Sequence, residues 1–237
     1  MWKMIHSIPI MAIFEIFYAP GKAFASLENR KAAWVAPLLL GVLFLALTTW
    51  GVLHYIGMET VMRQQLEGTR LTPEQMQLAM NRATSPGQVY ATYGGTVIVG
   101  MLSVLLIAGL LTVFALMGSK QPNFGSNFSA VALALFPYRL VICAMTLLVL
   151  IASPDRTTLD VTNMLATNVG AFMNKETMSK SLYTLLSAFD VLSFAEIGLM
   201  SYGFSKVNRT GLGFGLFSVL SLWLIYVSIR VGVSALF

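Results

Sequence analysis

The sequence predicts an all-α membrane protein with five transmembrane helices, and composition and segment length are the observations behind this prediction. Of the 237 residues, 57% are hydrophobic and only 11% are charged, whereas charged residues make up about a quarter of an average soluble domain. A helix needs about 20 mainly apolar residues to cross a hydrocarbon core of about 30 Å. Five stretches meet this requirement, at residues 34–55, 91–118, 128–151, 182–204 and 211–237.

The segment before the first span is expected to form short amphipathic helices at one membrane surface. Residues 10–19 (IMAIFEIFYA) form the first of these helices, with Phe14 and Phe17 facing the acyl boundary. A second short helix follows at about residues 22–30, after a Pro-Gly pair that ends the first. We therefore expect residues 1–31 to be an interfacial region with no span of its own.

Cations in this first region suit the surface of an anionic membrane. Lys22, Arg30 and Lys31 can meet anionic headgroups, at about 1 kcal/mol per cation. The alternative, which the sequence leaves open, is that these cations only set the orientation of the chain. Because Pro9 and Glu15 interrupt the apolar run, the segment does not fit a cleaved signal peptide.

The distribution of charge over the connections predicts the orientation. With the amino terminus in the cytoplasm, the cytoplasmic segments hold seven Lys or Arg and have a net charge of +5. The external connections hold six Lys or Arg and six acidic residues, so their net charge is zero. Cytoplasmic loops carry an excess of Lys and Arg. We expect a multi-pass protein of the plasma (inner) membrane, with residues 1–31 cytoplasmic, residues 32–237 forming the five-helix unit, and the carboxyl terminus external.

The first external connection contains a helix start signal. Thr72 is expected to be an N-cap, with Gln75 closing a capping box. A polar helix over residues 73–82 follows, and Met76 and Met80 are spaced so that they share one face. We favour packing of this methionine pair on neighbouring structure over a groove for a partner, because methionine stripes usually pack.

Small residues open the fifth span. Gly211 and Gly215 have the small-xxx-small spacing that lets two helix backbones approach closely in lipid. We expect this contact to lie within the chain, and homodimerisation is the alternative.

Four charged residues interrupt the apolar spans: Arg139, Asp190, Glu196 and Arg230. Arg139 follows Pro137, which removes a backbone hydrogen bond and is expected to kink the third span. At 1.5 Å per residue, Arg139 and Glu196 come to similar depths near the bilayer centre, while Asp190 and Arg230 lie about 10–12 Å below the outer edge. Matching depths predict two intramembrane ion pairs, Arg139 with Glu196 and Asp190 with Arg230.

The same four charges could instead serve transport. Acidic residues inside a membrane often mark the path of a proton or ion. The chain has no internal repeat and no matching pair of interrupted helices, which are typical of transporters. We therefore favour structural ion pairs, with a small-solute or ion permease as the alternative.

No motif for enzyme chemistry is present. The two histidines, His6 and His54, are isolated, and the single cysteine, Cys143, lies within the third span. Metal-binding, nucleophile and nucleotide-loop signatures are missing. Basic residues lack the aromatic neighbours of a nucleic-acid surface. We expect no enzymatic activity, no cofactor, no metal and no nucleic-acid partner.

Several stretches resemble the Yip (Ypt-interacting protein) domain family of five-span membrane proteins. Residues 16–41 are similar to the beginning of that domain, with an aromatic-x-x-Pro pattern and a tryptophan before the first span. Residues 71–80 (LTPEQMQLAM) and 163–173 (NMLATNVGAFM) look like loops of bacterial members. Residues 185–203 (LLSAFDVLSFAEIGLMSYG) are similar to the fourth span of the family, whose aspartate falls on Asp190.

This resemblance implies a membrane protein that works with partners. Eukaryotic members act in vesicle trafficking and bind prenylated Rab-type GTPases through a longer cytoplasmic amino-terminal region than this chain has. Some bacterial members are associated with ABC-type efflux assemblies. The resemblance thus implies a non-enzymatic membrane protein that organises or accompanies a partner complex, and fold carries over between relatives more securely than function.

Overall fold

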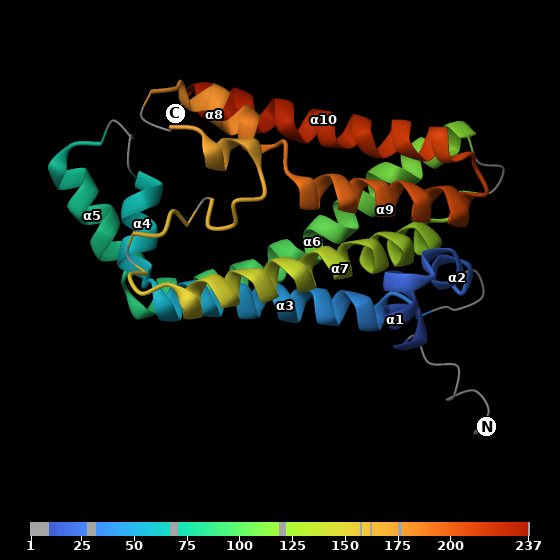
Figure 1. Ribbon diagram of the computed structural model, residues 1–237, viewed down its shortest axis with the longest axis horizontal. Coiled ribbons are helices and arrows are strands. Elements are labelled where there is room, and N and C mark those ends of the chain that lie inside the picture. Colours follow the sequence, from blue (N-terminus) through green and yellow to red (C-terminus); the bar gives the residue numbers. More distant parts are fainter. Residues whose placement is uncertain are drawn as a thin grey trace.

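The computed structural model describes residues 10–27, 32–66, 71–118, 122–156, 158–161, 163–174 and 177–236. These residues form an all-helical protein (Figure 1). Its helices are α1 (Ile10–Tyr18), α2 (Pro20–Ala25), α3 (Val35–Tyr55), α4 (Met58–Leu66), α5 (Pro73–Ala83), α6 (Pro86–Gly118), α7 (Phe124–Ala152), the short 3₁₀ helix η2 (Val169–Phe172), α8 (Lys180–Ser187), α9 (Val191–Asn208) and α10 (Leu212–Leu236).

Four helices in the described part of the chain are long and apolar enough to cross a membrane: α3, α6, α7 and α10. In hydrocarbon a helix is stable because all its backbone hydrogen bonds are made within the segment. These helices also expose many large apolar side chains, such as Leu106 and Leu148, which are 64% and 66% exposed. Such an exposed apolar surface suits contact with lipid, and the chain is a multi-pass membrane protein.

α7 is the centre of the bundle. It packs against α3, α6 and α9, and residues 127–136 are all buried. Pro137 lies inside α7, which continues as one helix on both sides of it. Figure 1 shows α3 and α7 running side by side and α6 crossing obliquely behind them toward α10, with α9 and α10 above, α1 and α2 at one end, and α4 and α5 at the other.

The fourth apolar stretch, expected as one span over residues 182–204, is not one helix. It is divided into α8 and α9, with Asp190 in extended conformation between them as the N-cap of α9. The Asp190 side chain accepts a hydrogen bond from the Ser193 backbone N–H at 2.9 Å. Because a free carboxylate satisfies one of the unpaired N–H groups at a helix start, Asp190 favours a new helix at this point.

α9 is therefore short. Its 18 residues include Glu196 and Lys206, and it is not among the four candidate spans. It nevertheless packs against both α7 and α10. The remaining predicted spans correspond to helices with slightly different ends, of which the largest difference is in α6, which starts at Pro86.

Two predictions about shorter segments can be compared with the structure. The capping box of Thr72 and Gln75 is present, so the predicted start of α5 is confirmed. The second short helix, expected at about residues 22–30, is present as α2 but begins at Pro20 and ends at Ala25, and its position at a membrane surface stays a prediction. Arg30 and Lys31, which were expected to meet headgroups, lie outside the described residues.

Candidate functional site

Arg139 is the most buried of the four charged residues in the predicted intramembrane network. It is 7% exposed and donates from Nη2 to the Gly100 carbonyl and to the Ser103 hydroxyl of α6, both at 3.2 Å. On its other side lies Gly41 of α3, where an added Cβ would be 3.1 Å from the Arg139 Cδ atom. Arg139 therefore joins α7 to α6 and packs closely against Gly41, where a larger residue would have to displace the arginine side chain by a few tenths of an ångström.

Glu196 of α9 is half-buried and faces the same region. It interacts electrostatically with Arg139 and with Asp190, and the half-buried Tyr138 interacts with Ser193 and with both carboxylates. The structure describes both Arg139 and Glu196 and gives no direct ion pair between them. The residues at the α7–α9 contact thus form a polar cluster held together partly by longer-range attraction.

Asp190 has direct partners different from the arginine that its depth suggested. Its Oδ2 atom accepts a hydrogen bond from the Thr167 hydroxyl at 2.6 Å, in addition to the cap on Ser193. Its backbone forms an antiparallel bridge with Asn168, and Val191 N–H donates to the Thr167 carbonyl at 3.0 Å. Asp190 therefore attaches the segment around Thr167 and Asn168, which precedes α8, to the start of α9.

Arg230 lies on an exposed part of α10. Its guanidinium carbon is 5.6 Å from the centroid of the Tyr226 ring, one turn earlier in the same helix. A cation over an aromatic face is attracted by the ring quadrupole. Among the described residues Arg230 has no direct contact with Asp190, and this part of the proposed network stays a prediction.

A buried chain of amides at the α1–α2 end was not anticipated from the sequence. Asn208 of α9 donates to Asn127 Oδ1 of α7 at 2.6 Å, and Asn127 donates to the Thr112 hydroxyl of α6 at 3.0 Å. Asn127 and Asn208 are only 1% and 4% exposed. Both lie at the ends of apolar runs, where an asparagine is an ordinary turn residue. Their position next to predicted spans was the only feature of the sequence that pointed to burial.

The two glycines expected at a close helix contact differ in their surroundings. A Cβ at Gly215 would collide with the Ser201 carbonyl and the Ser205 hydroxyl of α9, whereas a Cβ at Gly211 would meet open space. Gly211 contributes through its carbonyl, which accepts from the Ser205 hydroxyl at 3.2 Å. The close approach of α9 and α10 therefore depends on Gly215.

The amino-terminal helices are packed into the bundle on one side and exposed on the other. Phe24 of α2 is fully buried, with its ring where any side chain on Gly203 of α9 would lie, and it makes an edge contact with Tyr202. α1 buries Ala12, Ile13 and Ile16. It exposes four other large side chains, Met11, Phe14, Phe17 and Tyr18, each by more than half.

No cluster of three or more His, Cys, Asp or Glu side chains suitable for a metal ion occurs in the described ranges. Cys143 is buried with a free thiol. His54 is stacked on Trp50, with ring centroids 5.0 Å apart, and also touches the edge of Tyr55.

Comparison with known proteins gives a family. A family model described as the Yip1 domain matches residues 14–235, a range that runs from within α1 almost to the end of α10. Neither the curated proteins nor the solved structures give a match.

Proposed function

The chain belongs to the Yip1 domain family, and from this premise we propose that it organises or accompanies a partner complex in the membrane and has no catalytic activity of its own. The Yip1 family is in general a family of non-enzymatic membrane proteins. We assign the chain to the bacterial branch and to the plasma membrane. Among possible partners, the resemblance to bacterial members suggests an ABC-type efflux assembly.

The exposed apolar face of α1 is the observation that carries this proposal. Phe14 and Tyr18 are 64% and 75% exposed, yet α1 is held against the bundle by its opposite face, which contacts α7. An exposed apolar surface on a helix packed against the end of the bundle is suited to contact with a membrane protein and with the lipid boundary. We propose that it is the contact surface for the partner.

The orientation that fits this function has α1 and α2 on the cytoplasmic side and the carboxyl terminus outside. The positive charge of the cytoplasmic segments supports this orientation. We propose that α9 is the fifth membrane segment, because it packs between α7 and α10. The attraction between Arg139 and Glu196, together with the hydrogen bonds that Asp190 makes at the start of α9, then holds α9 in the bundle.

The test is co-purification in a mild detergent with variants that remove exposed apolar side chains from opposite ends of the bundle. We expect one membrane complex to be enriched with the wild-type chain and lost with the double variant Phe14→Ser/Tyr18→Ser. The variant Leu78→Ser, which removes an exposed apolar side chain from α5 at the other end of the bundle, should retain the complex. Equal recovery with all three chains would show that α1 is not the contact surface.

A permease is the second candidate, because Tyr138, Asp190 and Glu196 interact with one another inside an apolar bundle. It predicts solute or ion flux in proteoliposomes that contain only this chain, and loss of that flux with Glu196→Gln. Such a result, together with the absence of an enriched partner, would replace the organising function by transport.

A further inference from the structure

A cavity of about 640 Å³ lies between α3, α4, α5 and α6, at the end of the bundle opposite α1 and α2. Four threonines form its inner wall: Thr48 and Thr49 of α3, and Thr92 and Thr96 of α6. Small apolar and methionine side chains of α4 and α5 form the outer wall. Its volume is within the range of about 300–1,000 Å³ that is usual for ligand sites.

The inner wall is chemically suited to a hydrocarbon chain. Each of the four threonine hydroxyls donates to the backbone carbonyl four residues earlier in its own helix, at 2.8 to 3.1 Å. Thr49 and Thr96 also lie 3.3 Å apart across the two helices. Since these donors are already bonded, an apolar occupant would leave no buried donor unpaired, and the threonine methyl groups can contact it directly.

The cavity extends into the membrane part of the protein. Thr48 is seven residues, about 10 Å, from the end of α3, and Thr96 is ten residues, about 15 Å, from the start of α6. Both helices are candidate spans, with exposed lipid-facing side chains such as Trp50 and Ile98 at these levels. An occupant can therefore come from the surrounding bilayer.

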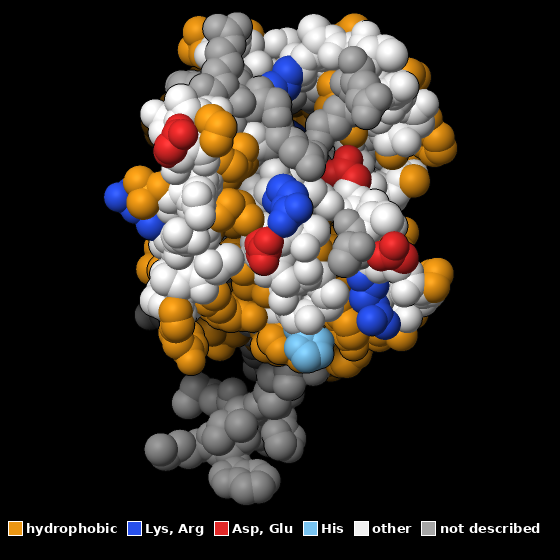
Figure 2. Space-filling view, turned by 90° about the vertical axis from the view of Figure 1, so that its left-hand side faces the viewer, with side chains coloured by type: hydrophobic (Ala, Val, Ile, Leu, Met, Phe, Trp, Pro, Cys, Tyr) orange, Lys and Arg blue, Asp and Glu red, His pale blue; other side chains and the backbone are white. Residues whose placement is uncertain are grey.

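The rim of the cavity provides one positive charge. Arg82 of α5 is the only charged residue among the described residues that line it, and Gln65 and Gln88 are the side-chain amides in the same lining. In the part of the chain that the structure describes, no residue accepts a hydrogen bond from the Arg82 guanidinium. Figure 2 looks onto this end of the molecule, where basic and acidic side chains are grouped between hydrophobic sides.

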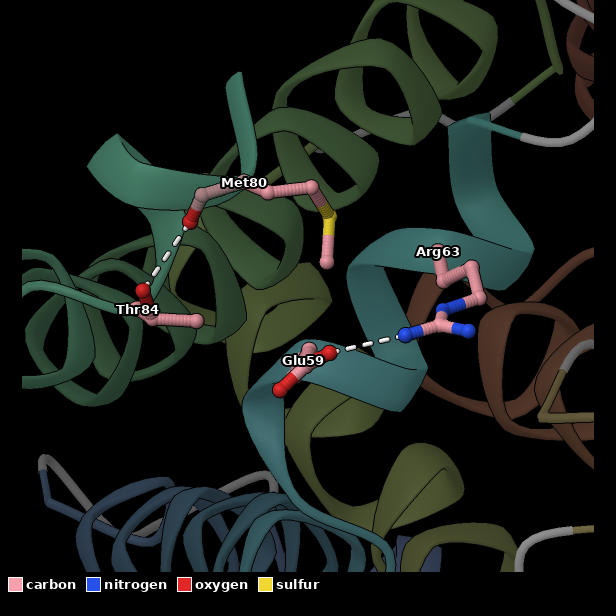
Figure 3. Close-up of polar contacts among 4 residues, drawn as sticks. All are labelled: Glu59, Arg63, Met80 and Thr84. Atoms are coloured by element: carbon pink, nitrogen blue, oxygen red, sulfur yellow. Dashed lines mark hydrogen bonds and ion pairs between the residues drawn. The ribbon is translucent and has the colours of Figure 1, made fainter. Parts of the chain in front are cut away.

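A neighbouring groove of about 470 Å³ between α4 and α5 serves as a comparison. There Arg63 donates to Glu59 at 2.8 Å, so its charge is already balanced. Figure 3 shows this pair beside Met80, whose carbonyl accepts from the Thr84 hydroxyl at 3.0 Å. At this end, Arg63 is thus a paired arginine outside the large cavity, whereas Arg82 at its rim has no partner among the described residues.

We propose that the large cavity binds an anionic phospholipid taken from the bilayer, with one acyl chain between the threonine wall of α3 and α6 and the covering helices α4 and α5, and with the headgroup at Arg82. The apolar wall accounts for the chain, and the unpaired guanidinium with two amides accounts for the anionic headgroup. The second acyl chain lies outside, on the exposed surface of the bundle. α4 and α5 cover the bound chain.

The proposal is tested with the full-length, delipidated protein in detergent, by native mass spectrometry during titration with phosphatidylglycerol or phosphatidylcholine. We expect tighter binding of phosphatidylglycerol, and a loss of about fivefold in Arg82→Gln, as expected for one cation near an anionic headgroup. Arg63→Gln is the matched control and should bind like the wild type. If both arginine variants bind phosphatidylglycerol equally well, the headgroup site is wrong.

A second pair of variants tests the acyl-chain part. Ala79 of α5 lines the cavity, so Ala79→Phe should fill it and abolish retention of either lipid. Leu78 is exposed on the same helix, so Leu78→Phe should not affect retention. Inorganic phosphate should give no protection against thermal unfolding. Protection by phosphate equal to that by phosphatidylglycerol, or full lipid retention by Ala79→Phe with unchanged circular dichroism, would overturn the proposal.

Discussion

Asp190 is the residue at which the sequence and the structure lead to different explanations of the same charge. Its depth suggested an ion pair with Arg230, but its two carboxylate oxygens are bonded to the Ser193 backbone N–H and the Thr167 hydroxyl. Both are short-range contacts to neutral groups. The oxygen of an asparagine amide can also accept from the Ser193 N–H, and its NH2 group can donate to the Thr167 hydroxyl instead of accepting from it. The role of Asp190 as a cap can therefore be separated by mutation from a role as a charge.

We expect Asp190→Asn to be nearly as stable as the wild type and Asp190→Ala to be less stable by about 1 kcal/mol, since asparagine is an equally good N-cap and alanine is not. The measurement is thermal unfolding in one detergent. Arg230→Gln is the accompanying control and should have little effect. Equal destabilisation by Asn and Ala, matched by Arg230→Gln, would restore the ion pair as the explanation.

Other residues in the bundle show what could be predicted and why the rest could not. A buried charge is conspicuous in an apolar run, so Arg139 was found from the sequence. Its acceptors, the Gly100 carbonyl and the Ser103 hydroxyl, leave no pattern, because any backbone carbonyl can accept. Asn127 and Asn208 were missed for a similar reason, since only the fold brings two residues so far apart in sequence together.

At the scale of elements, apolar length predicted α3, α6, α7 and α10 well, because a span must be about 20 residues long. It failed at α8 and α9, where the break at Asp190 is flanked by apolar residues on both sides and the hydropathy remains high. The amphipathic pattern before the first span predicted α1 and α2 as surface helices, but it did not indicate that Phe24 would be fully buried. That burial depends on Gly203, a distant glycine whose partner cannot be read from composition.

Phe24→Ala should release α2 from α9. Removing a fully buried phenylalanine side chain costs about 3–5 kcal/mol when the site cannot collapse. A helix of six residues has little stability without tertiary contacts, so this loss should detach α2 from the bundle. Trypsin should then cleave faster at Lys22, an exposed residue of α2. Phe14→Ala removes a side chain that is 64% exposed and should leave the rate unchanged; equal acceleration by both variants would mean that α2 is not docked through Phe24.

At the scale of the whole molecule, the bundle has two unlike ends. α1 and α2 lie at one end, while α4, α5 and the carboxyl-terminal end of α10 lie at the other (Figure 1). The chain must cross the membrane an odd number of times, counting α3 and α10, if its two ends are to lie on opposite sides. Whether α9 crosses the membrane is thus linked to the side on which each end lies.

Labelling of single cysteines with a membrane-impermeant maleimide in intact cells measures these sides directly. Cys143 is buried and 3% exposed, so the background is low and every signal comes from an introduced thiol. With five crossings and the amino terminus inside, Leu78→Cys and Leu236→Cys should be labelled from outside, and Ala25→Cys only after lysis. If Leu78→Cys and Leu236→Cys react from opposite sides, α9 does not complete a crossing and only four helices span the membrane.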